Sequence, residues 1–185
     1  LSYCDTAGPE LDVFGFGWCW DGNYYAADSI KKYISVTQEY IDYCADNSIG
    51  TEVIFTTGPV DSYTLALGYL KYLAYEQIRD SVLADPTRIL FDYADILCYD
   101  DGSETPNTRT YDGHVYPWIT TTNLGDGTVA HISSAGALRL AKAMWWMLAR
   151  IAGWDGVSDS GPTGIKKTGI SGKPTMLGGK WVRIV

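Results

Sequence analysis

The segment around His131 combines the residue types of a general base and of a carboxylate that could orient it. Asp126 lies five residues before His131, and Ser133 and Ser134, which follow it, can cap the start of a helix. An imidazole displayed from a loop in this way can take a proton from a hydroxyl group or from water, which is the base chemistry of hydrolysis. A loop histidine can also be structural or merely exposed, and the sequence alone leaves this interpretation open.

Residues 17–23 (Gly-Trp-Cys-Trp-Asp-Gly-Asn) form a second candidate segment. Gly17 and Asn23 are its candidate oxyanion-binding positions, because small and amide-bearing residues can present hydrogen-bond donors to a developing negative charge. The aromatic residues Trp18 and Trp20 fit another interpretation equally well. In that interpretation the segment is a tight turn that packs for stability.

The cysteines have no spacing typical of a zinc site, and the chain has only two histidines to add to them. We therefore predict no metal and no other cofactor. An even number of cysteines in an acidic chain rich in Tyr and Gly favours one or two disulfides in an extracellular, secreted protein, whereas buried thiols of a cytosolic protein are the alternative. The disulfide candidates are Cys4, Cys19, Cys44 and Cys98.

Strands and helices are predicted to alternate along the chain. Three short apolar segments have the composition of buried strands, at residues 12–18, 52–57 and 89–93. Three longer segments repeat apolar residues every three or four positions and are predicted helices, at residues 28–46, 63–82 and 133–152. Strands separated by helices form a parallel sheet, which defines an α/β fold, and functional loops follow the carboxyl ends of its strands. On the last helix, one face carries Leu138, Ala141, Trp145, Leu148 and Ile151.

Charge and composition divide the chain and exclude two classes of partner. Residues 1–154 form one predicted α/β domain, and residues 155–185 form a Gly-rich tail with five basic and two acidic residues that ends in a predicted β-strand. A net charge of -8 argues against nucleic acid, because binding to phosphates needs clustered cations. The longest apolar run, residues 141–154, is interrupted by Lys142 and Arg150 and is shorter than the roughly 20 residues of a membrane span.

Several segments in this order resemble one enzyme superfamily. They are residues 17–20 (Gly-Trp-Cys-Trp), residues 90–96 (Leu-Phe-Asp-Tyr-Ala-Asp-Ile), the Gly-containing stretch at 136–143 after His131, and residues 145–154. Over about residues 11 to 154, the chain resembles the SGNH (GDSL-type) hydrolases, in particular a poorly characterised, exported bacterial branch of that superfamily.

The resemblance implies a flavodoxin-like three-layer α/β/α sandwich and ester hydrolysis by a serine nucleophile. His131 matches the base of the family, and Asn23 or the turn around Gly17 lies near its oxyanion block. The family's carboxylate normally lies three residues before the histidine, where this chain has Thr128, so Asp126 is expected to replace it. The serine belongs to a first strand and helix that the chain is expected to lack, and Ser29 is expected to be a helix N-cap instead.

Two functions of different classes follow from this reasoning. In the first, the chain is the C-terminal portion of a secreted ester hydrolase that acts on acylated carbohydrate, with its serine outside this chain. In the second, it is a catalytically silent extracellular subunit that assembles with copies of itself into a filament by donating a strand or the tail.

Overall fold

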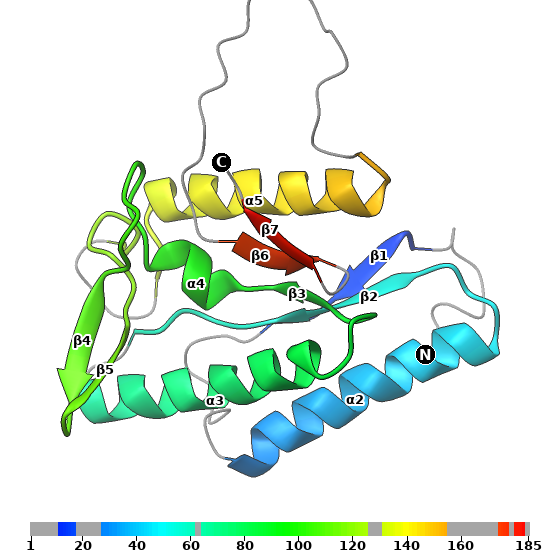
Figure 1. Cartoon of the computed structure of the whole chain (residues 1–185), viewed down its shortest axis with the longest axis horizontal. Coiled ribbons are helices and arrows are strands. Elements are labelled where there is room, and N and C mark those ends of the chain that lie inside the picture. Colours follow the sequence, from blue (N-terminus) through cyan, green and yellow to red (C-terminus); the bar gives the residue numbers. More distant parts are fainter. Residues whose placement is uncertain are drawn as a thin grey trace, which may run out of the picture.

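A three-stranded parallel sheet lies at the centre of the fold. In this computed structural model, described for residues 11–17, 27–61, 64–125 and 131–154 and for the backbone of two short C-terminal strands, the order of the central strands is β1-β2-β3. The strands are β1 (Val13–Gly15), β2 (Glu52–Thr56) and β3 (Ile89–Phe91), and β2 pairs in parallel with both neighbours (Figure 1). The predicted α/β class with a parallel sheet is therefore confirmed.

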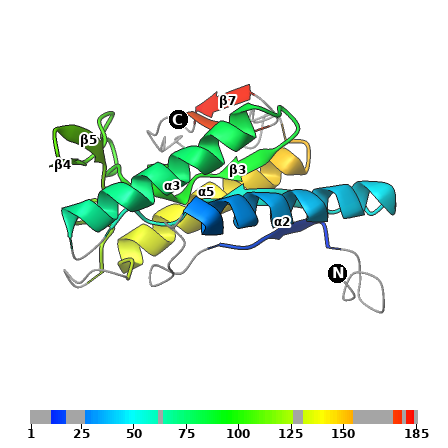
Figure 2. The ribbon, with the colours of Figure 1, turned by 90° about the horizontal axis from the view of Figure 1, so that it is seen from below.

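Helices cover both faces of this sheet. The crossover helices α2 (Ala27–Asp46) and α3 (Leu65–Leu83) lie on one face, and α5 (Ser134–Ile151) lies on the other (Figures 1 and 2). The core consists of two apolar clusters, one on each face of the sheet, because successive side chains of a strand such as β2 point to opposite faces. Phe55 belongs to the apolar cluster of α2 and α3, and Ile54 belongs to the cluster that contains Met147 of α5.

Two elements after β3 were not predicted, and the first of them begins inside the predicted strand 89–93, which ends at Phe91 in the structure. The short helix α4 (Tyr93–Leu97) begins directly after Asp92, whose carboxylate caps it by accepting a hydrogen bond from the Asp95 N–H. The hairpin of β4 (Thr108–Tyr111) and β5 (His114–Pro117) lies between residues 93 and 133, where no strand or helix was predicted. Its turn residues Asp112 and Gly113 have φ values of 47° and 76°, which match the left-handed turns that join antiparallel strands.

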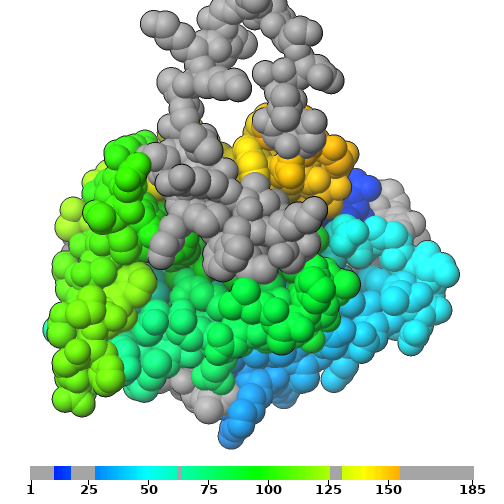
Figure 3. Space-filling view, viewed as in Figure 1, coloured from blue at the N-terminus to red at the C-terminus, as the bar shows by residue number. Residues whose placement is uncertain are grey.

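The β4–β5 hairpin is held against α3 by buried aromatic side chains. The Tyr116 hydroxyl donates a hydrogen bond to the Leu65 carbonyl at 2.8 Å. The Trp118 ring packs so closely over Gly68 that a Cβ atom at Gly68 would lie 2.2 Å from the ring. Figure 3 shows the hairpin at one margin of the molecule, in contact with the N-terminal half of α3.

The structure corrects two details of the predicted helices. Ser29 is not an N-cap, because α2 begins at Ala27 and Ser29 lies inside its first turn. On α5 the N-cap is Ser133, as predicted, but the C-cap is Ala152, and Gly153 with φ 93° follows it.

The apolar face that the sequence shows on α5 points mostly away from the sheet. Trp145 is 70% exposed and Leu138 is 56% exposed, whereas Gly136, Ala143 and Met147 are buried against the core. An apolar helix face normally covers the core. The sheet of this protein instead packs against another face of α5, which carries Gly136, Ala143 and Met147.

The tail contains two strands, β6 (Pro174–Leu177) and β7 (Lys180–Arg183), that pair with each other. β7 confirms the strand predicted at the end of the tail, and β6 lies beside β3 of the same chain without joining its sheet (Figure 1). Among the described helices, none has the length and apolar character to cross a membrane.

Candidate functional site

The backbone at His131 is fixed by contacts on both sides of it. The His131 carbonyl accepts a hydrogen bond from the Gly125 N–H at 2.7 Å, and Ile132 forms a β-bridge with Leu124. Two residues later, the Ser133 hydroxyl accepts a hydrogen bond from the Gly136 N–H at 3.0 Å and so caps α5. This arrangement holds the His131 backbone at the start of α5 while its imidazole is exposed.

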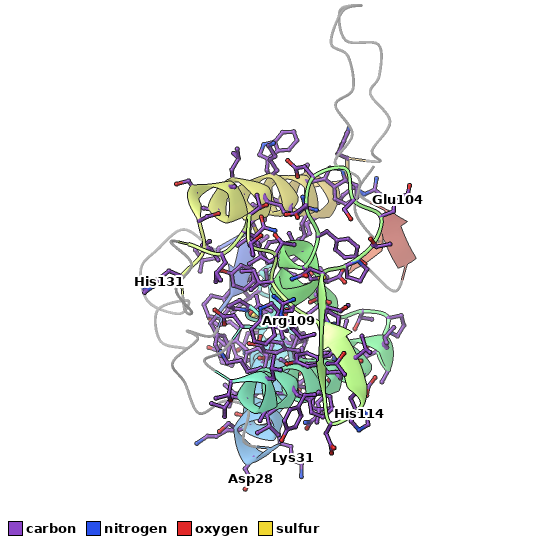
Figure 4. The ribbon with its side chains drawn as sticks, turned by 90° about the vertical axis from the view of Figure 1, so that its left-hand side faces the viewer. Asp28, Lys31, Glu104, Arg109, His114 and His131 are labelled. Carbon is purple, nitrogen blue, oxygen red and sulfur yellow. The ribbon has the colours of Figure 1, made fainter. Side chains whose placement is uncertain are left out.

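His131 lies at the edge of the molecule where active sites of parallel α/β sheets are found. The start of α5 lies at the carboxyl ends of the strands (Figure 1), and ligands of such sheets bind at that edge. In Figure 4, His131 lies at the left of the view, below the level of α5, whereas the second histidine of the chain, His114, lies at the lower right at the far end of the β4–β5 hairpin. The two histidines therefore belong to separate surfaces.

Gly17 lies at the same edge, two residues after the end of β1. A Cβ atom at Gly17 would lie 3.2 Å from the Thr56 Oγ1 atom, so Gly17 lies close against the Thr56 side chain. The Thr56 hydroxyl donates to the Phe16 carbonyl at 2.8 Å, and the Thr56 N–H donates to the Tyr33 hydroxyl at 2.8 Å. Burial raises the pKa of the Tyr33 hydroxyl, although hydrogen bonds to Thr56 oppose this effect. These contacts fix the position of the chain just before residues 18–26.

Several predicted residues are not placed by the structure. Asp126, Asn23, Cys4 and Cys19 lie outside the described residues. The two candidate cysteines that are described are Cys44 and Cys98, and both are buried thiols in this structure rather than halves of a disulfide. The Cys98 thiol donates to the Asp95 carbonyl at 3.1 Å, so its hydrogen bond is local to α4. In the described part of the chain, no three His, Cys, Asp or Glu side chains gather in a way that could hold a metal ion.

A buried ion pair that the sequence analysis missed lies at the carboxyl ends of β2 and β3. The Asp92 carboxylate accepts hydrogen bonds from Arg79 Nε at 2.7 Å, from Arg79 Nη2 at 2.9 Å and from the Thr57 hydroxyl at 2.8 Å. Burial acts to raise the pKa of Asp92, but the charge and hydrogen bonds of Arg79 outweigh it and hold this pKa below its ordinary value. The same contact raises the pKa of Arg79 against the effect of burial.

This network positions the sheet edge and is unsuited to proton transfer. The Asp92 oxygens already accept four hydrogen bonds, including the one from the Asp95 N–H, and a lowered pKa makes the carboxylate a weaker base. A signal was present in the sequence, because Thr57 and Asp92 each lie at the C-terminal end of a predicted strand and therefore share one edge. The choice of Arg79 as their partner depends on how α3 packs.

A second buried ion pair joins the loop after β2 to α3. The Lys71 ammonium lies 3.3 Å from an Asp61 carboxylate oxygen, and both side chains are almost fully buried. A buried charge needs an opposite charge nearby, so this pair fixes the start of α3 against the loop. Asp61 thus faces a cation inside the fold and does not serve as a base at the surface.

Among the described residues at this edge, His131 presents an exposed imidazole, the side chain that serves most often as a general base. Ser133 lies two residues after His131, and its hydroxyl caps α5 by accepting a hydrogen bond from the Gly136 N–H. The described residues therefore present an exposed imidazole at His131 and a close contact of Gly17 with the Thr56 side chain, and among them no hydrogen bond joins a serine hydroxyl to the His131 imidazole. Comparison of the chain with protein-family models, with curated proteins and with solved structures gives no match in any of the three.

Proposed function

We propose that this chain is the C-terminal, base-bearing portion of an SGNH-like carboxylic-ester hydrolase with a flavodoxin-like three-layer fold. The observation that carries the proposal is the position of His131, exposed directly before the N-cap of α5 at the carboxyl ends of a parallel sheet. The parallel order β1-β2-β3 with helices on both faces supports the fold part of the proposal. The sequence resemblance adds an extracellular location and an acylated carbohydrate as substrate.

In the proposed reaction, His131 removes the proton from a serine hydroxyl as its oxygen attacks the ester carbonyl. Asp126 orients the imidazole, and N–H donors of the Gly17 turn and of Asn23 stabilise the negative oxygen that forms. His131 then returns the proton to the departing alcohol, and water releases the acyl group from the serine by the same route. The serine is contributed by a segment outside residues 1–185.

The test compares the two histidines of the chain in the enzyme that includes this serine segment. A fluorophosphonate probe, which reacts with activated serine hydroxyls, should label a serine outside residues 1–185, and the enzyme should cleave p-nitrophenyl acetate. His131→Ala should abolish both reactions, since the serine then loses its base. His114→Ala is the matched control, because His114 is also exposed but lies at the far end of the β4–β5 hairpin.

Persistent labelling in His131→Ala would contradict the proposed role of His131. The absence of labelling and hydrolysis in the unmodified enzyme would contradict the hydrolase itself. Circular dichroism of the His131→Ala variant should match that of the parent, because His131 is exposed and its backbone makes the hydrogen bond to Gly125.

One observation favours a structural subunit as a second candidate function. Within the described residues, β1 pairs on one side only and so offers an edge to a strand from another copy. The β6–β7 hairpin lies beside β3 of its own chain, so donation would require it to leave that position. Electron microscopy of the native protein separates the two functions, because ordered polymers of this chain alone support the subunit and discrete particles support the hydrolase.

A further inference from the structure

The outward face of α5 carries a line of apolar side chains with regular spacing. Leu138, Ala141, Trp145 and Leu148, which we call the α5 stripe, are all exposed. Trp145 has the largest exposed fraction, 70%, among the large apolar residues of the described chain. The face toward the sheet already has its own buried residues, so packing within the described fold does not account for the stripe.

The spacing of the α5 stripe is typical of a surface that packs against another helix. Its residues follow one another at intervals of three, four and three, the pattern that places side chains along a seam between two helices. An exposed tryptophan at the centre of such a seam leaves a large apolar surface in water. Burial of that surface against a second helix is favourable.

A shallow groove lies next to Trp145 on the same helix. It has a volume of about 410 Å³ and is lined by Ala141, Lys142, Trp145 and Trp146. The small side chain of Ala141 leaves room one helical turn before the bulky Trp145. One helix thus presents both a projection and a recess, which are the two halves of a self-complementary surface.

We propose that α5 forms a symmetric, antiparallel dimer interface with α5 of a second copy of this chain. The spacing of the stripe is the same in both directions, so an antiparallel pair places Leu138 of each copy opposite Leu148 of the other. In this register Trp145 of each copy enters the groove over Ala141 of the other. The same patch serves both copies, so the assembly closes as a two-fold dimer.

Two of the three cations of α5 already interact within their own chain, which leaves an acidic partner little to bind along the stripe. The helix contains no acidic residue, and its cations are Arg139, Lys142 and Arg150. Arg139 pairs with Asp101, and Arg150 donates to the Trp154 carbonyl at 2.8 Å and lies over the Trp146 ring. Lys142 is the one cation of α5 that lines the groove. Its ammonium can lie over the indole ring of Trp145 from the other copy. The seam is therefore almost entirely apolar.

The first test is sedimentation equilibrium of the full 185-residue chain over a range of concentrations. The parent protein should form a dimer, and Trp145→Ala should raise the dimer Kd by about 30-fold or more, because a central buried tryptophan is a typical interface hot spot. The matched control is Val115→Ala, since Val115 is 65% exposed but lies on β5. This control should leave the dimer Kd unchanged.

The second test checks the antiparallel register by cysteine cross-linking. A mixture of Leu138→Cys and Leu148→Cys proteins should form a disulfide-linked dimer between the two variants under oxidation. Each variant alone should not, because equivalent positions in the antiparallel pair lie about 15 Å apart along the helix axis. The parent chain under the same oxidation controls for its native cysteines.

Three outcomes would overturn the proposal. If the chain stays monomeric at all concentrations, the α5 stripe does not form a dimer interface. The stripe is then either exposed or covered by residues of its own chain outside the described ranges. A dimer or larger assembly that tolerates Trp145→Ala uses another surface. Efficient cross-linking of Leu138→Cys with itself would show a parallel arrangement of the helices.

Discussion

Replacement of Asp92 by Asn tests whether the buried ion pair holds the carboxyl ends of β2 and β3 in place. The substitution keeps the size of the side chain and removes its charge. Asn offers one oxygen acceptor instead of two, so one of the two Arg79 N–H groups that now donate to Asp92 at 2.7 and 2.9 Å would face an NH2 group. The Arg79 charge would also lose its most buried partner.

The expected loss of unfolding free energy is about 3 kcal/mol, the lower end of the range of about 3–5 kcal/mol for removal of one partner of a buried ion pair. The lower end applies because the Arg79 side chain is 18% exposed and keeps an ion pair with Glu76. Urea unfolding at pH 7, followed by circular dichroism, measures this difference. The slope with urea should be unchanged, since the folded state buries the same surface.

Asp101→Asn is the matched control. Asp101 also pairs with a buried arginine, Arg139, but its own side chain is 85% exposed. Water can replace its hydrogen bond, so the expected change is within about 1 kcal/mol. The comparison separates the effect of a buried carboxylate from the effect of loss of any Asp–Arg pair.

The effect of Asp92→Asn should also depend on pH. Because the pKa of Asp92 is lowered in the folded state, its ionised form stabilises the fold at pH values above the ordinary carboxyl pKa of about 4. This stabilisation is lost as the pH falls through the folded-state pKa, so the parent and the variant should approach each other in stability below about pH 4. A difference under 1 kcal/mol at pH 7, or one that does not shrink in acid, would refute this account of the edge.

Two glycine substitutions give further predictions by the same unfolding assay. Gly68→Ala gains about 1 kcal/mol of helix propensity, but its Cβ atom would lie 2.2 Å from the Trp118 ring, and overpacking of this kind costs about 1–3 kcal/mol. The net result should be destabilisation, and a variant more stable than the parent would contradict the packing of the hairpin on α3. Gly113→Ala meets no atom within 4 Å but has φ 76°, so it should cost about 1–2 kcal/mol from the backbone alone. An unchanged stability for Gly113→Ala would contradict the left-handed turn between β4 and β5.

The local sequence determined the elements of the fold well where one physical signal dominated. The β-branched and aromatic run at β2 and the three- and four-residue repeats of α2 and α3 gave elements whose ends differ from the prediction by one or two residues. The alternation of these elements was enough to predict a parallel sheet, because helices between the strands prevent hairpins. Ser133 was predicted as a cap because its side chain acts on the helix that directly follows it.

The sequence was less informative where the structure depends on segments far apart in the chain. The β4–β5 hairpin depends on Tyr116 and Trp118 packing against Leu65 and Gly68 of α3, about 50 residues earlier, and its strands are mostly exposed and polar. Their polar composition gave no strand signal, since apolar alternation is what sequence patterns detect. The hairpin therefore exists because of tertiary packing.

The candidate site, too, was predicted from the sequence only in part. Its residue types and their order place His131 before a helix and Gly17 near the end of a strand, because both positions follow from local pattern and from the rule that parallel strands end at one edge. Only the tertiary structure decided that Arg79 neutralises Asp92 and that α5 turns Gly136, Ala143 and Met147 toward the sheet while Trp145 stays in water. A helix with two apolar faces can pack by either one, and the choice between them depends on the shape of the surface it meets, which no single segment encodes.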